Sequence, residues 1–429
     1  MKNNRKNASD KPKKVFFFLR HNNDIDHIVP VIYKWLSTEN TPTDVVIYSK
    51  KEFLDDYRIN YIKQFKNANI YYMDKLLNDS KIYSFLSKIM SKVPIANRTL
   101  ELNLSRKKPR FLERKAIKKI GEKIFNKENR GFIVFDWTLT PFVKYICKMA
   151  KKKNFITVSL PHGDAPYVND IIDLSQYKAV ENKNLSIEQL RSGKNYKCFD
   201  YLVVPNYLVS KRYEDIEKDK LKVLGSPRYS NEWMNILSNI LPPYSNNKSE
   251  NKLKIVFFLR NLNYPIFWEE VIRTIKLIIK IPNVYLVVKH HPRGGSIKEL
   301  SEIKSPEKIE HIYHDVPSGS LVKWADLVID IGTSAAWGPV KQGVPVLAPE
   351  YLYANYSTIA YYIKTSEIRS RDEIYDIIQK FTKEKNRKFY KENERKRFIE
   401  EIIDVPDKYI LERYVKFLRK CLDESTKKK

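Results

Sequence analysis

The sequence predicts an α/β protein made of two doubly wound domains that face each other across a cleft, with helices at its C-terminal end. The chain has 429 residues, of which 42% are hydrophobic, which is enough for two cores. The runs KVFFFLRHNND at residues 14–24 and KIVFFLRNLNY at residues 254–264 are alike, since each is an apolar stretch closed by Leu-Arg and a polar loop. Such a run is typical of the first strand of a parallel sheet that is covered on both faces.

After each of these runs, short apolar stretches alternate with segments of helical period. This order is typical of βαβ units, and using it twice predicts two parallel sheets. The expected strands lie at residues 44–49, 131–137, 155–160 and 201–206 in the first half, and at residues 284–290, 327–332 and 344–349 in the second.

Composition divides the chain further. Residues 241–252, LPPYSNNKSENK, are rich in Pro, Ser and Asn and have no apolar period, so we expect a linker there. The expected parts are a disordered basic tail at 1–13, a first domain at 14–240 with a basic helical insertion at 88–130, the linker at 241–252, a second domain at 253–385, and helices that pack back toward the first domain and end in a basic tail at 386–429.

The charge of the chain predicts anionic partners. Lys and Arg number 79 against 51 Asp and Glu, a formal net charge of +28. Residues 88–130 alone hold fourteen Lys or Arg against four Glu, with apolar residues between them. This pattern is typical either of a solvated helical face or of a surface that meets anionic lipid or an anionic ligand. Nucleic acid is not the expected partner, because no binding module for it is recognisable.

Several kinds of site are not expected from the sequence. Cys147, Cys198 and Cys421 are far apart and form no CxxC pair, and the chain has neither a secretory signal nor 18 consecutive apolar residues. We therefore expect a reduced, cytoplasmic protein. The chain also has no GxGxxG, P-loop, HExxH or GxSxG motif and no Cys/His metal spacing, so no metal site is expected.

The second half carries a set of residues suited to an anion. His290, His291 and Arg293 follow the strand expected at 284–290, at the edge where α/β sheets bind ligands. Gly332, Thr333 and Ser334 follow the next strand and open a helical segment, whose first N–H groups favour a phosphate. Each feature alone is explained by a loop cap or a helix cap, but together they predict a phosphate site. By position, Glu350 is a candidate for ribose hydroxyls.

The first half supplies the candidates for proton transfer. His162 stands between Pro161 and Gly163 after an expected strand, and an imidazole there suits a general base or a structural hydrogen bond. Asp164 is a second candidate. Asp24 begins a DxD triplet, a pattern that can hold a divalent metal but that arises readily by chance. We expect Asp24 instead to contact the acceptor or to cap a helix. Arg228 could touch a phosphate, although an exposed turn also explains it.

These motifs resemble the GT-B enzymes that build bacterial surface polymers, in particular the CDP-glycerol glycerophosphotransferases and the capsule polysialyl- and Kdo-transferases. The resemblance rests on two Rossmann-like halves, the His162-Gly163 pair, the His291-Pro292 pair and the later Ser/Thr-bearing helix start. It implies that His162 is the acceptor base and that His291, Thr333 and Ser334 bind the donor's phosphates. The run GTSAAWG stands where an Asp-Tyr-Ser-Ser type of run is usual, so the resemblance indicates a superfamily more firmly than a donor.

The resulting hypothesis is a metal-independent, inverting glycosyltransferase whose first domain binds the acceptor and whose second binds the donor. The donor would be a UDP-, CMP- or CDP-linked sugar, with no cofactor required. The acceptor would be a glycan or a lipid-linked chain, and the enzyme would lie on the inner face of the cytoplasmic membrane, against anionic lipid. The alternatives are a non-hydrolysing nucleotide-sugar epimerase, a basic nucleic-acid-binding protein and a non-catalytic GT-B scaffold.

Overall fold

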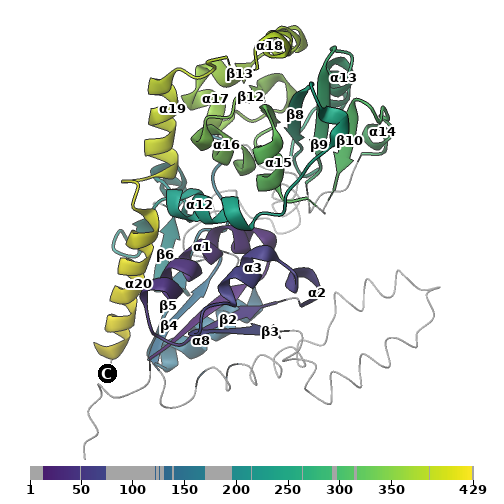
Figure 1. Cartoon of the computed structure of the whole chain (residues 1–429). Helices are drawn as coiled ribbons and strands as arrows, with labels where there is room; N and C mark the ends of the chain where they lie inside the picture. Colours follow the sequence, from purple (N-terminus) through teal and green to yellow (C-terminus); the bar gives the residue numbers. More distant parts are fainter. Residues whose placement is uncertain are drawn as a thin grey trace, which may run out of the picture.

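Two α/β halves make up the protein, one above the other in Figure 1, with helix α12 (Asn231–Ile240) between them. The structure is a computed structural model. It describes residues 13–48, 50–73, 121, 125, 130–137, 140–169, 196–213, 215–262, 264–291, 297–313, 316–385 and 387–427.

The first half is built on a parallel sheet of seven strands. Its order, β3-β2-β1-β4-β5-β6-β7, places β1 and β4 at the centre, where the apolar run that opens the chain is buried. The strands are β1 (Lys13–Leu19), β2 (Thr43–Ile47), β3 (Ala68–Tyr72), β4 (Arg130–Phe135), β5 (Phe155–Ser159), β6 (Tyr201–Val204) and β7 (Leu221–Val223).

The second half repeats this plan with six parallel strands in the order β10-β9-β8-β11-β12-β13. Strand β8, which opens this half, again lies inside the sheet between β9 and β11. The strands are β8 (Leu253–Phe258), β9 (Val284–Lys289), β10 (Ile309–Ile312), β11 (Leu327–Asp330), β12 (Val346–Pro349) and β13 (Glu367–Ile368).

Helices cover both faces of each sheet, because the strands are apolar on both sides. In the first half, α1 (Asn22–Thr38), α3 (Tyr57–Ile62) and α20 (Ile410–Lys427) form one core with the sheet, and α8 (Pro141–Lys152) closes the other face. In the second half, α13 (Trp268–Ile278) and α18 (Arg371–Lys383) cover one face, while α15 (Ser318–Trp324), α16 (Trp337–Gln342), α17 (Thr358–Tyr362) and α19 (Glu392–Phe398) lie on the other.

The end of the chain links the two halves. Helix α19 packs in the second half, whereas α20 lies against β4 and β5 of the first sheet, and the two run along one side of the molecule in Figure 1. The last helix therefore completes the core of the domain that the chain built first.

The predicted fold class, two doubly wound α/β domains, is confirmed by these two sheets. The predicted basic insertion at 88–130 lies outside the described residues except for Gly121, Phe125 and Arg130, and most of the tail at 1–13 lies outside them as well. Among the described residues, no helix has the length and apolar character needed to cross a membrane.

Candidate functional site

The two halves enclose a cavity of about 820 Å³. It is reached by the carboxyl ends of strands from both sheets, since Asn22 follows β1, Lys289 ends β9 and Ala335 follows β11. This is the edge at which parallel sheets bind ligands. Much of the remaining wall comes from α1, α3, the 3₁₀ turn Pro227–Tyr229, α12 and the short helices α15 and α16.

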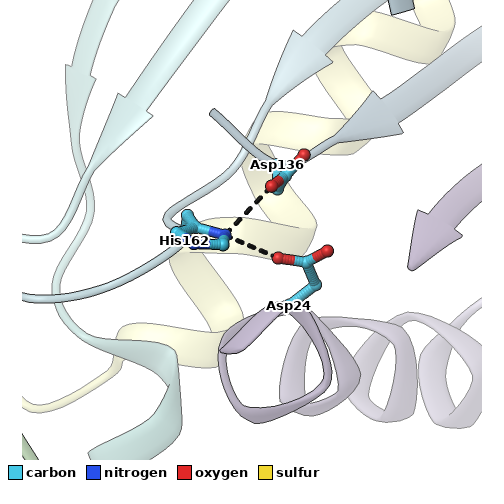
Figure 2. A group of neighbouring side chains, drawn as sticks. All are labelled: Asp24, Asp136 and His162. Atoms are coloured by element: carbon cyan, nitrogen blue, oxygen red, sulfur yellow. Dashed lines mark hydrogen bonds and ion pairs between the residues drawn. The ribbon is translucent and has the colours of Figure 1, made fainter. Parts of the chain in front are cut away.

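His162 lies beside this cavity, on the loop after β5. Its Nδ1 atom is 2.7 Å from Asp24 Oδ1 and 2.9 Å from Asp136 Oδ2. Dashed lines mark these two contacts in Figure 2. The imidazole is 21% exposed, and no hydrogen bond of its Nε2 atom is found among the described residues. The first turns of α1 lie between His162 and the cavity. Asp24 contacts His162, whereas Asn22 and Asp26 line the cavity.

Local structure explains why Asp24 faces the imidazole. The Arg20 and His21 backbone N–H groups donate to Asp24 Oδ2 at 2.8 and 3.0 Å, at the start of α1. This cap fixes the carboxylate and leaves Oδ1 for His162. Asp136, directly after β4, accepts a hydrogen bond from Arg20 Nη2 at 3.0 Å on the same oxygen that faces the imidazole.

The charges of this cluster favour a protonated imidazole. Burial alone would lower the pKa of His162, but the hydrogen bonds and charges of Asp136 and Asp24 outweigh it and raise the pKa to about 9. With His162 protonated, two cations, His162 and Arg20, balance two carboxylates.

The same three side chains, Asp24, Asp136 and His162, offer ligand atoms within 4.8 Å of one another, close enough to share a cation. Hydrogen bonds already join these atoms, and Arg20 brings a positive charge to Asp136. We therefore assign no metal site here.

Asp164, the second candidate for proton transfer, is not placed to meet a substrate. Its side chain is 0% exposed, and its Oδ2 atom lies 3.7 Å from Nε2 of the equally buried His27. Burial raises the pKa of Asp164 to about 7, and it holds the pKa of His27 well below the usual value. The catalytic role that the sequence suggested for Asp164 stays a prediction.

The loop of Gly332 and Thr333, where we expected a phosphate, holds a carboxylate of the protein itself. Both backbone N–H groups donate to Asp330, at 2.9–3.0 Å, and the Thr333 hydroxyl donates to the same group. Burial raises the pKa of Asp330 to about 6 despite these hydrogen bonds. Ser334 follows at the start of a short 3₁₀ turn and is half-buried.

His290 and Glu350 make contacts within the second half. The His290 ring stacks on Tyr313 at 4.1 Å, and its Nε2 atom is 3.1 Å from His311 Nδ1. Burial, then His311, lowers the pKa of His290 to about 4, so this ring is neutral at pH 7. Glu350 accepts hydrogen bonds from Tyr353 and from the Ser357 backbone. His291 is half-buried at the same edge, and Arg293 lies outside the described residues.

Arg228 lies in the cavity wall, opposite the second half. Its side chain is only 19% exposed, which differs from the exposed turn that the sequence also allowed. Its ion pair with Asp26 is long, 3.4 Å from Nη2 to Asp26 Oδ2. Asp26 is shared with Arg58, which Asp56 also holds through two hydrogen bonds. The DxD carboxylates therefore serve different partners, Asp24 the imidazole and Asp26 two arginines.

Sequence reasoning missed Asp136 and Asp330, which carry much of the local charge. Each stands at or directly after the carboxyl end of a strand, in GFIVFDW and LVIDIG. An acidic residue closing an otherwise apolar strand was the signal that could have found both, because a carboxylate is costly to bury without a partner.

Comparison with known proteins shows which fold this is. No protein-family model matches the chain, and no curated protein is similar to it in sequence. Among solved structures, S. aureus MnaA with UDP has a TM-score of 0.55 and 12% identity, over 96% of this chain and 97% of that one. UDP-GlcNAc 2-epimerase from Neisseria meningitidis, bound to UDP-GlcNAc, has a TM-score of 0.51 and 11% identity, over 96% and 100%.

The wall teichoic acid polymerase TagF, in a variant soaked with CDPG, is similar as well. It has a TM-score of 0.52 and 12% identity, over 96% of this chain and 89% of that one. At these identities the likeness shows the fold alone. The chain has the two-domain GT-B fold that the sequence predicted.

Proposed function

We propose that the protein is a GT-B glycosyltransferase. It would move a sugar, or a sugar-like or polyol-phosphate unit, from a nucleotide-activated donor to a growing surface polysaccharide or a lipid-linked acceptor. The observation that carries the proposal is His162, whose Nδ1 is held by two carboxylates while its Nε2 has no hydrogen bond among the described residues. A carboxylate on Nδ1 is the arrangement that orients an imidazole for proton transfer at Nε2.

In this reaction the neutral form of His162 takes the proton of an acceptor hydroxyl at Nε2. The acceptor oxygen forms a bond to the anomeric carbon of the donor as the bond from that carbon to the phosphate oxygen breaks. The nucleotide leaves with its electron pair, and the new proton stays on the imidazolium. For a polyol-phosphate donor the attacked atom would be phosphorus instead.

The cavity supports a nucleotide donor by its charge. Its wall contains five cations against two anions, Asp26 and Asp56, and Asp404 pairs with one of the lysines. The cations are Arg58, Arg228, Lys289, Lys323 and Lys341. The remaining positive excess would offset the charge of a leaving diphosphate, with Arg228, His291 and Ser334 as proposed contacts.

A nucleotide-sugar epimerase is the second candidate. The proteins of similar fold include UDP-GlcNAc 2-epimerases, and a pKa of about 9 keeps His162 protonated at neutral pH. An imidazolium can donate the proton that an epimerisation returns to carbon. The protonated state of His162 therefore suits a general acid, whereas a general base would first have to lose this proton.

One experiment separates these functions. Purified protein is first screened for thermal stabilisation by UDP, CMP, CDP and GDP, since a ligand that binds only the native state raises its stability. The matching nucleotide sugars are then incubated with and without a membrane extract as acceptor. Nucleotide release that requires the extract supports the transferase, and an altered sugar without any acceptor supports the epimerase. Stabilisation by none of the nucleotides would overturn both.

We also propose that the enzyme works in the cytoplasm, attached peripherally to the inner face of the membrane. What supports this is the basic composition of residues 88–130 and the anionic or lipid-linked acceptor that the reaction needs. Cosedimentation with anionic and with neutral liposomes across a salt series tests it, and duplex DNA in the same series tests the nucleic-acid alternative.

A further inference from the structure

We propose that Asp136 is a positioning residue for His162, which supplies the negative charge that keeps the proton on the imidazole and so sets the pH at which the site works. The inference rests on the proposed function only for its effect on turnover. The pairing itself is a property of the free protein.

The contacts of the two carboxylates divide their tasks. Asp24 caps α1 with one oxygen and contacts the imidazole with the other, so it fixes the ring through the backbone. Asp136 is 4% exposed, and its Oδ2 atom lies 2.9 Å from His162 Nδ1 and 3.0 Å from Arg20 Nη2. Asp136 is thus the carboxylate whose charge can be removed without removing the helix cap.

The charged and titratable groups near His162 are carried by several different elements of the first half. Asp24 and Asp136 are the anions that contact the imidazole, and Arg20 is the cation beside them. His27 and Asp164 lie in the buried region next to the loop, with Arg228 facing both, and Tyr48 faces the carboxylates. The groups, with their elements, are Arg20 after β1, Asp24 and His27 on α1, Tyr48 after β2, Asp136 after β4, Asp164 on the loop of His162, and Arg228 in the 3₁₀ turn Pro227–Tyr229.

This balance predicts opposite effects for two substitutions. In Asp136→Asn, the charges of Arg20 and Asp24 balance each other, so no negative charge is left to balance the imidazolium. His162 would therefore lose its proton more easily. In Arg20→Gln, both carboxylates remain and the positive charge beside them is gone, so the imidazolium would be held more tightly. The Arg20 backbone N–H that caps α1 is unchanged by either substitution.

The first measurement needs no substrate. The titration of His162 is followed by NMR in the full chain labelled with ¹⁵N-histidine, and its signal among the seven histidines is assigned with His162→Gln. We expect the midpoint to fall by about one pH unit or more in Asp136→Asn, to rise in Arg20→Gln, and to return toward the parent value in Asp136→Glu. Asp44→Asn is the control, because Asp44 is a buried carboxylate of β2 that bonds Asn69.

Midpoints that do not move, or that move the same way in both variants, would overturn the pairing. Thermal unfolding shows whether each variant is folded, and Arg20→Gln keeps the proposal testable if Asp136→Asn is not. The second measurement is the pH–rate profile, whose acidic limb should move with the NMR midpoint while nucleotide binding is unchanged. A midpoint that moves without the limb would support the pairing and contradict His162 as the base, which is a failure of the proposed function.

Discussion

Tyr167 of the first half lies so close to Gly332 of the second that a Cβ atom at position 332 would be 2.1 Å from the tyrosine ring. The Tyr167 hydroxyl also donates to the Ile331 carbonyl at 3.3 Å. Nearby, Thr358 donates to the Ala165 and Pro166 carbonyls at 2.6 and 2.8 Å. The loop that carries His162 is therefore fastened, a few residues later, to the edge of the second sheet.

Replacing Gly332 by Ala should disrupt this contact. Gly332 has φ +79°, which an L side chain adopts only with strain, and the added methyl group would displace the Tyr167 ring. We expect a loss of about 2–4 kcal/mol in the free energy of unfolding, measured by urea denaturation. Gly163→Ala is the control for stability, because a Cβ there meets nothing within 4 Å. Equal stabilities of the two variants would show that the contact between the halves is not formed.

His162→Gln should bind nucleotide almost as the parent does but turn over about 10²–10⁴ times more slowly, the range for losing a general base. The parent's rate should rise about tenfold per pH unit up to about pH 9, because only the neutral imidazole accepts a proton. Burial lowers the pKa of His162, but Asp136 and Asp24 outweigh burial and raise this pKa to about 9. A rate that falls over the same range would assign His162 the role of an acid. The pH–rate profile of kcat/KM checks this.

The central strands could be predicted from the sequence and the edge strands could not. Strands β4 and β9 are buried along their length and β1 is buried from Val15 on, and each contains a continuous apolar run. Strands β3 and β10 lie at the sheet edges, where only part of each strand is buried, so ANIYY and IEHI show no such run. A strand that is buried on both faces can be predicted from the sequence, because it requires a continuous apolar run.

Candidate site residues show a similar division. The sequence placed His162 and Asp24 at sheet edges, but the contact between them joins positions 138 residues apart. The local sequence pattern also predicted a phosphate at Gly332 and Thr333, because their backbone N–H groups were expected to be free. In the structure these N–H groups donate to the Asp330 carboxylate. Which polar group meets which is decided by tertiary packing, so sequence patterns name the candidates without their partners.

Asp164 should make the protein less stable as the pH rises. Burial raises its pKa from 3.8 to about 7, so its contribution to stability is fully present below about pH 4 and is lost as the pH rises through 7. An amide stays neutral, so Asp164→Asn should gain stability relative to the parent between pH 5 and pH 8. Up to about 1.4 kcal/mol per pH unit is expected, measured by urea unfolding. His162, whose pKa is also raised, likewise contributes stability that is lost as the pH rises, through about 9, and this contribution is common to both proteins and cancels in the difference. Parallel curves would contradict a buried, titrating Asp164.

The last prediction concerns Arg228 and the ligand of the cavity. Other cavity cations are already engaged, since Arg58 is held by Asp56 and Asp26, Lys341 by Asp404, and Lys323 by the Ser238 carbonyl. Arg228 has the long ion pair with Asp26 and lies over the Tyr229 ring at 5.1 Å, and no hydrogen bond of its guanidinium is found among the described residues. A planar group with open donors in a cavity wall is suited to a phosphate, which it can bind through two parallel hydrogen bonds.

Arg228→Gln should therefore weaken binding of the stabilising nucleotide by about 10- to 100-fold, the loss expected for hydrogen bonds to a charged group. Arg228→Lys should recover part of it, because the charge returns without the two-pronged geometry. Titration calorimetry with the nucleotide diphosphate and the matching nucleoside separates the phosphates from the base, and only the diphosphate should respond to the substitution. Lys323→Gln is the matched control and should change the affinity by less than about threefold, because its ammonium group already bonds a carbonyl. An affinity for the diphosphate that is the same in Arg228→Gln and in the parent would remove Arg228 from the donor site and leave it as the partner of Asp26.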